Sequence, residues 1–126
     1  MQETSVGRTV VTRAAVLDVV SVLAFVAIGR RNHDEGTAIS GVFSVAAPFL
    51  IALAVAWAGG RAWRAPQSFR TGAAVWLTTV VVGLAMRRLV FDHGIATAFV
   101  IVATLFLGFA LLGWRAIATR RSSKHL

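Results

Sequence analysis

The stretch "AVLDVVSVLAFVAIGRRNHDEG" (residues 15–36) sets an apolar run directly against a group of charged residues. Asp18 is the one ionisable residue between Ala15 and Gly29, and two arginines, a histidine and two acids follow within a few positions. This first apolar run covers about residues 13–30, and three more cover about 38–58, 70–91 and 94–114. A helix that crosses a bilayer needs about 20 mostly apolar residues. The pattern therefore predicts an all-α integral membrane protein, a bundle of four spanning helices.

The composition argues against an ordinary soluble domain. Of the 126 residues, 57% are hydrophobic and 14% are charged, and the mean hydropathy is +0.75, whereas soluble domains carry about 25% charged residues. The net charge of +8 would suit a nucleic-acid partner, but the arginines border apolar segments and do not gather on a polar face. We therefore expect the lipid bilayer and anionic lipid headgroups as partners, and no nucleic acid. The chain has no cysteine, which excludes disulfides and thiolate metal sites.

Lysines and arginines are divided unequally between the two sides that four spans define. The side of both termini and the middle connection holds nine of them: Arg8, Arg13, Arg61, Arg64, Arg70, Arg115, Arg120, Arg121 and Lys124. The other side holds four: Arg30, Arg31, Arg87 and Arg88. Because cytoplasmic loops hold the excess, we expect both termini in the cytoplasm and a multi-pass protein of a bacterial inner (plasma) membrane. All four tryptophans lie toward the cytoplasmic side, as in one half of an aromatic belt.

Basic residues stand near both ends of the chain. Arg8 and Arg13 precede the first apolar run, as basic residues do in a secretory signal. Asp18 within the run and the double arginine after Gly29 disagree with a cleavage site, so we expect an uncleaved first helix. Residues 115–126 form a basic cytoplasmic tail, and we expect its end, "TRRSSKHL" (119–126), to be solvated and open to disorder. Residues 1–126 then form a single four-span domain.

An offset of 57 positions aligns the two halves of the chain. The offset superposes basic residues that border two spans: Arg13 with Arg70, Arg30 with Arg87, and Arg31 with Arg88. One further position superposes residues of the next connections: Asp34 with Asp92, and Gly36 with Gly94. A duplicated two-helix hairpin would give this pattern, with its halves related by an axis along the membrane normal. The alternative is that any short span is bordered by arginines, and few apolar positions inside the spans match.

Asp18 lies within the first span, about a turn and a half from its expected cytoplasmic end. A carboxylate in a span is costly, and it commonly pairs with a cation or serves a function. Arg13 is five residues away and poorly placed on the same helix, so Arg70 or Arg115 from a neighbouring helix is the better partner. In one interpretation Asp18 takes up a proton and couples it to substrate movement. In the other it is structural, favoured by the dipole of a nearby helix N-terminus and hydrated at the interface.

A second group of polar residues is expected at the outer face: Arg30, Arg31, His33, Asp34, Glu35, Arg87, Arg88, Asp92 and His93. Histidines and acids could ligate a divalent metal, but no helical histidine spacing supports such a site, and we expect no metal and no cofactor. The basic groups could instead hold an anionic substrate or a lipid headgroup. The simpler interpretation is a solvated, salt-bridged rim, which the near balance of charges favours.

Pro48 lies in the middle of the second span, in "VAAPFLIALA" (residues 45–54). A proline at this place removes a backbone donor and frees the carbonyl of Ser44, which predicts a kink. The kink could open a cavity, or it could only shape the packing of the bundle.

Five segments together resemble a family of small prokaryotic four-helix membrane proteins known as domain of unknown function three-zero-five-four. The segments are "LDVVSVLAFVAIGRRNH" (17–33), "APFL" (47–50), "VWLTTVVVGLAMRR" (75–88), "HGIATAFVIVAT" (93–104) and "LLGWRAI" (111–117). The resemblance implies a four-span architecture and supplies no activity. It draws attention to these positions: Asp18, Arg30, His33, Pro48, Arg87 and Arg115.

Two kinds of function fit the sequence. The leading one is a small oligomeric transporter or channel-like protein for a small or anionic solute, with Asp18 as the coupling carboxylate and Arg30 and Arg87 at an outer gate. Because four helices enclose little volume, we expect a homo-oligomer or a partner membrane subunit. The rival is a non-catalytic accessory or assembly subunit of a larger membrane complex. No nucleophile, phosphate-loop or zinc motif is present, so we expect no enzyme. The candidate functional residues are Asp18, Arg30, His33, Pro48, Arg70, Arg87, Asp92, His93 and Arg115.

Overall fold

The computed structural model describes residues 2–32, 39–90 and 97–124 of the chain, and these are almost entirely helical. The four long helices are α1 (Gln2–Asn32), α2 (Ile39–Gly60), α3 (Phe69–Leu89) and α4 (Thr97–Lys124). A single 3-10 turn, η1 (Ala62–Arg64), lies in the connection between α2 and α3. The predicted all-α four-helix fold is confirmed.

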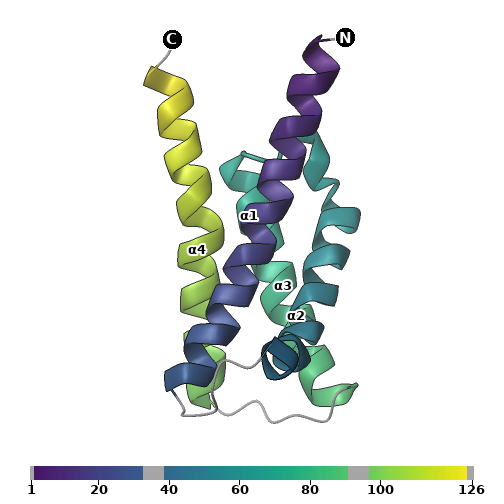
Figure 1. Ribbon diagram of the computed structural model, residues 1–126, viewed down its shortest axis with the longest axis vertical. Helices are drawn as coiled ribbons and strands as arrows, with labels where there is room; N and C mark the ends of the chain where they lie inside the picture. Colours follow the sequence, from purple (N-terminus) through teal and green to yellow (C-terminus); the bar gives the residue numbers. More distant parts are fainter. Residues whose placement is uncertain (1, 33–38, 91–96, 125–126) are drawn as a thin grey trace.

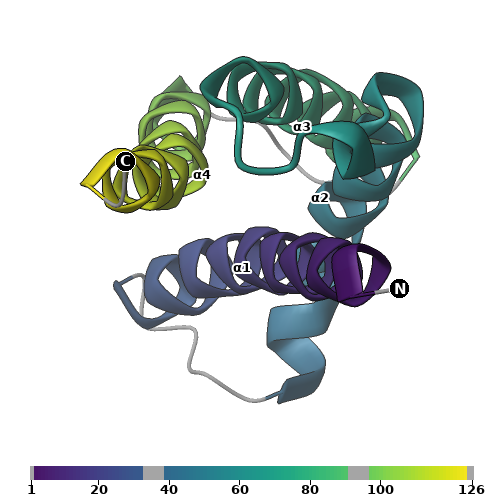
Figure 2. The same ribbon diagram turned by 90° about the horizontal axis from the view of Figure 1, so that it is seen from above.

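The helices form a ring in the order of the chain. Each helix packs against its sequence neighbours, and α1 also packs against α4, which closes the ring. In the view from above, α1 lies opposite α3, and α2 lies opposite α4 (Figure 2). The beginning of α1, the end of α4 and the α2–α3 connection all lie at one end of the bundle (Figure 1). We refer to this end as the terminal end.

Each of the four helices contains a segment that is long and apolar enough to cross a membrane. These segments are Gly7–Gly29, Gly41–Gly60, Phe69–Leu89 and Thr97–Arg120. The chain is therefore a multi-pass membrane protein. Between 22% and 33% of each segment is buried within the chain, so most of the helix surface faces outward, where side chains such as Phe109 and Leu89 are more than 80% exposed.

Two helices are longer than the sequence predicts. The first helix begins at Gln2, well before the expected start of the span. The last helix, α4, continues through the basic segment after residue 114 and ends at Lys124. Residues 115–124 contain no glycine or proline to end the helix, and the Thr119 hydroxyl donates to the Arg115 carbonyl within it (2.8 Å). Membrane thickness sets the length of the apolar span, not the length of the helix that carries it.

Four phenylalanines fill the centre of the bundle. The Phe25 ring lies 5.8 Å from Phe49, 5.8 Å from Phe99 and 5.7 Å from Phe106, between ring centroids, distances typical of favourable aromatic pairs. Gly83 makes room for them, because a Cβ atom there would lie 2.5 Å from Cδ1 of Phe49. Close packing of this kind, rather than the hydrophobic effect, holds helices together in lipid.

Pro48 is buried within a continuous α2. The first turns of this helix project to one side of the bundle, away from the direction of the remainder (Figure 2). This bend agrees with the kink predicted from the proline.

Candidate functional site

Asp18 lies on the side of α1 that faces the core. The buried residues Ala14, Val22 and Phe25 share this side, because they are four residues before it and four and seven after it. Asp18 itself is 0% exposed. It also lies near the middle of α1, which begins at Gln2. The structural interpretation of Asp18 as a hydrated residue near a helix N-terminus is therefore wrong.

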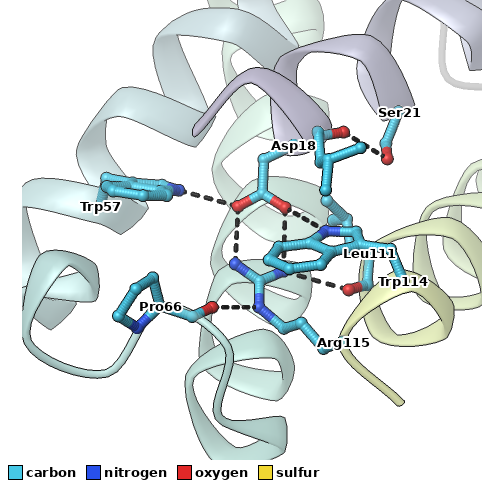
Figure 3. Close-up of polar contacts among 8 residues, drawn as sticks. Asp18, Ser21, Trp57, Pro66, Leu111, Trp114 and Arg115 are labelled. Atoms are coloured by element: carbon cyan, nitrogen blue, oxygen red, sulfur yellow. Dashed lines mark hydrogen bonds and ion pairs between the residues drawn. The ribbon is translucent and has the colours of Figure 1, made fainter. Parts of the chain in front are cut away.

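Arg115 of α4 forms a two-pronged ion pair with Asp18 (Figure 3). Its Nη2 atom donates to Oδ2 at 2.7 Å, and its Nη1 atom donates to Oδ1 at 2.9 Å. Both side chains are 0% exposed. Such paired hydrogen bonds between a planar guanidinium and a carboxylate are among the strongest in proteins and also fix the relative orientation of the two groups.

Two tryptophans donate to the same carboxylate. The indole Nε1 of Trp57 in α2 donates to Oδ2 at 2.8 Å, and that of Trp114 in α4 donates to Oδ1 at 2.9 Å. Asp18 therefore accepts four hydrogen bonds, two on each oxygen. We call Asp18, Trp57, Trp114 and Arg115 the Asp18 cluster.

Two further N–H groups of Arg115 donate to backbone carbonyls. Its Nε donates to the carbonyl of Pro66 in the α2–α3 connection at 2.8 Å, and its Nη1 donates to Leu111 one turn earlier in α4 at 3.0 Å. The guanidinium carbon also lies 4.4 Å from the centroid of the Trp114 ring, a cation–π contact. Arg115 thus joins α1, α4 and the α2–α3 connection.

Gly72 in α3 provides the space for this side chain. A Cβ atom at Gly72 would lie 2.6 Å from Cδ of Arg115 and 3.0 Å from Cδ2 of Leu112, closer than side chains pack. All four helices thus contribute to the environment of the ion pair.

The energetics of this cluster are those of a buried ion pair in which the carboxylate accepts four hydrogen bonds and four of the five guanidinium N–H groups donate. Taking two charges out of water is costly, and the cost is recovered only where the geometry is good and the remaining donors and acceptors are bonded. Here the carboxylate has four donors and the guanidinium bonds to three acceptor groups. Chemically, the cluster is a fixed pair of opposite charges. Neither member can bind a solute without first leaving the other.

The family model described as "Protein of unknown function (DUF3054)" matches residues 15–118, which include the whole Asp18 cluster. The chain belongs to this family. Neither a curated protein nor a solved structure matches it. The four apolar helices agree with the architecture that the sequence resemblance implied, while the family description gives no activity.

The structure decides between the two arginines proposed as partners of Asp18. Arg115 is the partner, whereas Arg70 is exposed at the beginning of α3, where its backbone N–H donates to the Ser68 hydroxyl at 3.2 Å. Arg13 is exposed and makes no part of the cluster. The prediction that a cation from a neighbouring helix pairs with Asp18 is confirmed.

Only part of the predicted outer rim falls within the described residues. Arg87 in α3 is half-buried, with its guanidinium carbon 4.2 Å from the centroid of the Phe99 ring in α4. The backbone of Arg30 belongs to α1, but its side chain lies outside the described part, as do three further candidates: His33, Asp92 and His93. Among the described residues, no three His, Cys, Asp or Glu side chains gather as a metal site requires.

Sequence reasoning missed the role of the tryptophans. They were interpreted as an aromatic belt at the membrane surface, yet Trp57 and Trp114 point inward to Asp18. Trp76 also points inward and donates to the carbonyl of Thr104 at 2.8 Å. Trp63, which is 48% exposed, fits the belt. The available signal was the buried carboxylate itself, since it needs nearby donors and the indole N–H is one that tolerates an apolar setting.

Proposed function

We propose that this protein is a small membrane transporter for a small anionic solute, and that Arg115 is the cation that binds the solute. The observation that carries the proposal is the buried ion pair between Asp18 and Arg115. Ionisable residues inside membrane spans are rare, and they mark substrate pathways, ion pathways and proton relays. A solute with a carboxylate or phosphate group presents the same pair of oxygens as Asp18, and arginine binds both groups with the same fork of donors.

In this mechanism the solute replaces Asp18 on Arg115. The released carboxylate keeps the indole of Trp57 as a donor, because Trp57 lies on α2 and binds it independently of Arg115. Asp18 can then take up a cation or a proton and so couple solute movement to an ion gradient. The empty transporter returns to the paired state when Asp18 again occupies Arg115.

The proposed movement separates α1 from α4 at the terminal end. Asp18 belongs to α1, and both Arg115 and Trp114 belong to α4. The movement therefore breaks the ion pair and also the Trp114 hydrogen bond, which both join the two helices. At the other end of α3, Arg87 above Phe99 would contribute to an outer gate, together with Arg30. The protein would act without catalysis, in a bacterial inner membrane with its termini in the cytoplasm.

A homo-oligomer would complete the pathway. Large side chains on the outer faces of α3 and α4 are exposed, among them Val81 (65%), Leu105 (67%) and Phe109 (84%). These faces are available to lipid and to a second copy of the chain.

The second candidate is a non-catalytic accessory subunit of a larger membrane complex. The observation that favours it is the dense hydrogen bonding of the Asp18 cluster, since Asp18 accepts four hydrogen bonds and Arg115 makes four. A pair so well satisfied can serve as a rigid joint, and the outward apolar faces would then contact partner helices.

Transport is tested with purified protein in liposomes on a solid-supported membrane. Concentration jumps of chloride, inorganic phosphate, acetate and lactate are applied as probes, and the transient current is recorded. The transporter proposal predicts a current with at least one probe, and its loss in Arg115→Gln but not in the exposed control Arg120→Gln. No current with any of the four anions, together with copurification of a stoichiometric membrane partner, would favour the accessory subunit.

A further inference from the structure

The connection between α2 and α3 has two distinct sides. Its inward side is formed by Ala62, which is 1% exposed, and by buried Pro66. Its outward side, together with the first residues of α3, carries exposed aromatic and basic residues: Arg61, Trp63, Arg64, Phe69 and Arg70. We call these five residues the connection face. Three of them are cations, and Trp63 and Phe69 are 48% and 56% exposed.

Arg61 adopts an unusual backbone conformation. Its φ and ψ angles are both 51°, in the left-handed region, and it is the one described non-glycine residue with a positive φ. Glycine is strongly preferred at this place after a helix, because it has no Cβ to crowd the backbone. Here Gly59 and Gly60 come just before, and the left-handed position itself holds an arginine. A non-glycine residue in a strained backbone conformation favours the hypothesis that its side chain has a role.

The connection face lies at the ends of two membrane-spanning segments, Gly41–Gly60 and Phe69–Leu89. Its arginines are therefore at the depth of lipid headgroups, where an exposed tryptophan such as Trp63 is also typical. Among the residues at this end whose side chains the structure describes, the one acid is Asp18, which is buried and paired. We propose that the connection face binds the phosphate groups of anionic phospholipids, and that these headgroups hold the connection against the Asp18 cluster.

The link to the cluster is the carbonyl of Pro66. This carbonyl belongs to the connection and accepts a hydrogen bond from Nε of Arg115 at 2.8 Å. The connection is also tied to α3, because the Ser68 side chain accepts from the backbone N–H of Arg70. Headgroups bound to Arg61, Arg64 and Arg70 therefore restrain the segment that positions Arg115. This inference goes beyond the transport proposal and stands whether or not the protein moves a solute.

The experiment compares nanodiscs of phosphatidylcholine with nanodiscs that also contain phosphatidylglycerol. The wild type is set beside two triple variants that remove the same charge from the same end. The connection variant is Arg61→Gln, Arg64→Gln and Arg70→Gln. The matched control is Arg8→Gln, Arg13→Gln and Arg120→Gln, all exposed and on other elements. Thermal unfolding is followed by tryptophan fluorescence, and retained phosphatidylglycerol is counted by native mass spectrometry.

We expect phosphatidylglycerol to raise the Tm of the wild type and of the control variant by several degrees. The connection variant should lose most of this rise and retain less phosphatidylglycerol. One arginine at an anionic membrane surface favours binding of anionic over neutral headgroups by roughly fivefold. Three arginines should therefore favour phosphatidylglycerol over phosphatidylcholine by about a hundredfold. An equal loss in both variants, or no rise in the wild type, would overturn the proposal. An equal rise with free glycerol phosphate in phosphatidylcholine nanodiscs would assign the site to a soluble phosphate instead.

Arg61→Gly keeps the proposal testable if the triple variant does not fold. Glycine suits the left-handed backbone, so the Tm in phosphatidylcholine should stay the same or rise. The response to phosphatidylglycerol should nevertheless fall, because the charge is gone. An unchanged response to phosphatidylglycerol in Arg61→Gly would contradict a role for this side chain in headgroup binding.

Discussion

Removing Arg115 should expose how strongly the ion pair holds the bundle together. In Arg115→Met the Asp18 carboxylate loses two of its four donors and stays buried with the indoles of Trp57 and Trp114. Each hydrogen bond to a charged group is worth about 1.5–3 kcal/mol, which gives roughly 3–6 kcal/mol for two such bonds. Breaking a buried pair by removing one partner costs about 3–5 kcal/mol. We therefore expect the free energy of unfolding to fall by about 4 kcal/mol.

A double-mutant cycle separates the pair from the rest of the cluster. Asp18→Leu should be about as costly as Arg115→Met, because it leaves a buried guanidinium unpaired. The double variant leaves no unpaired charge, so it should cost at least about 3 kcal/mol less than the sum of the single variants.

Unfolding in mixed micelles, titrated with a denaturing detergent and followed by helical circular dichroism, measures these energies. Arg120→Met is the control, since exposed Arg120 should change stability by no more than about 0.5 kcal/mol. Additive effects of Asp18→Leu and Arg115→Met, or a single-variant cost below about 1 kcal/mol, would refute the reasoning.

Three further substitutions test the surroundings of the pair and the core, all with the same unfolding assay. Gly72→Ala places a Cβ against the side chain of buried Arg115, so we expect the free energy of unfolding to fall by about 1–3 kcal/mol. The control is Gly113→Ala, which has no atom within 4 Å of the new Cβ and should raise the free energy of unfolding by up to about 1 kcal/mol. Equal effects of the two substitutions would contradict the close packing at Gly72. Gly83→Ala places a Cβ too close to the Phe49 ring and should also lower the free energy of unfolding by about 1–3 kcal/mol. An unchanged free energy of unfolding would show that the core rearranges to accept the Cβ. Trp57→Phe removes one donor to Asp18 and should lower the free energy of unfolding by about 1.5–3 kcal/mol. An unchanged free energy of unfolding would contradict this role of Trp57.

The four-helix membrane fold could be predicted because it depends on length and apolarity alone. The helix ends could not, because nothing in a span's hydropathy stops a helix at the membrane surface. The basic segment after Trp114 therefore stays helical to Lys124, and the start of α1 lies well before Arg13.

The candidate site could be predicted only in part. The cost of a buried charge led to Asp18 and to a cation from another helix, but choosing Arg115 over Arg70 required the rotation of each helix about its axis. That rotation is set by packing, for example at Gly72, where a Cβ atom would lie 2.6 Å from Cδ of Arg115. The tryptophans were assigned to the membrane surface because position along a span says nothing about which way an indole points.

One feature of the Asp18 cluster agrees with the predicted internal repeat, which stays a prediction. Trp57 and Trp114 are separated by the same 57 positions as the aligned arginines, and they donate to the two oxygens of one carboxylate. At that offset Asp18 corresponds to Val75 and Arg115 to Ala58. If the halves are duplicated, the ion pair is where their symmetry is broken.

The distance between α1 and α4 at the terminal end tests most directly whether the Asp18–Arg115 pair holds these helices together and releases them. The chain has no cysteine, so spin labels can be attached specifically to Arg13→Cys and Arg120→Cys, exposed positions five residues from each member of the pair. Pulsed electron–electron double resonance should give one narrow distribution of the distance between the two labels when the pair is intact. In the Asp18→Asn background the distribution should broaden and extend to longer distances. An identical narrow distribution in both backgrounds would contradict a pair that governs the contact between α1 and α4.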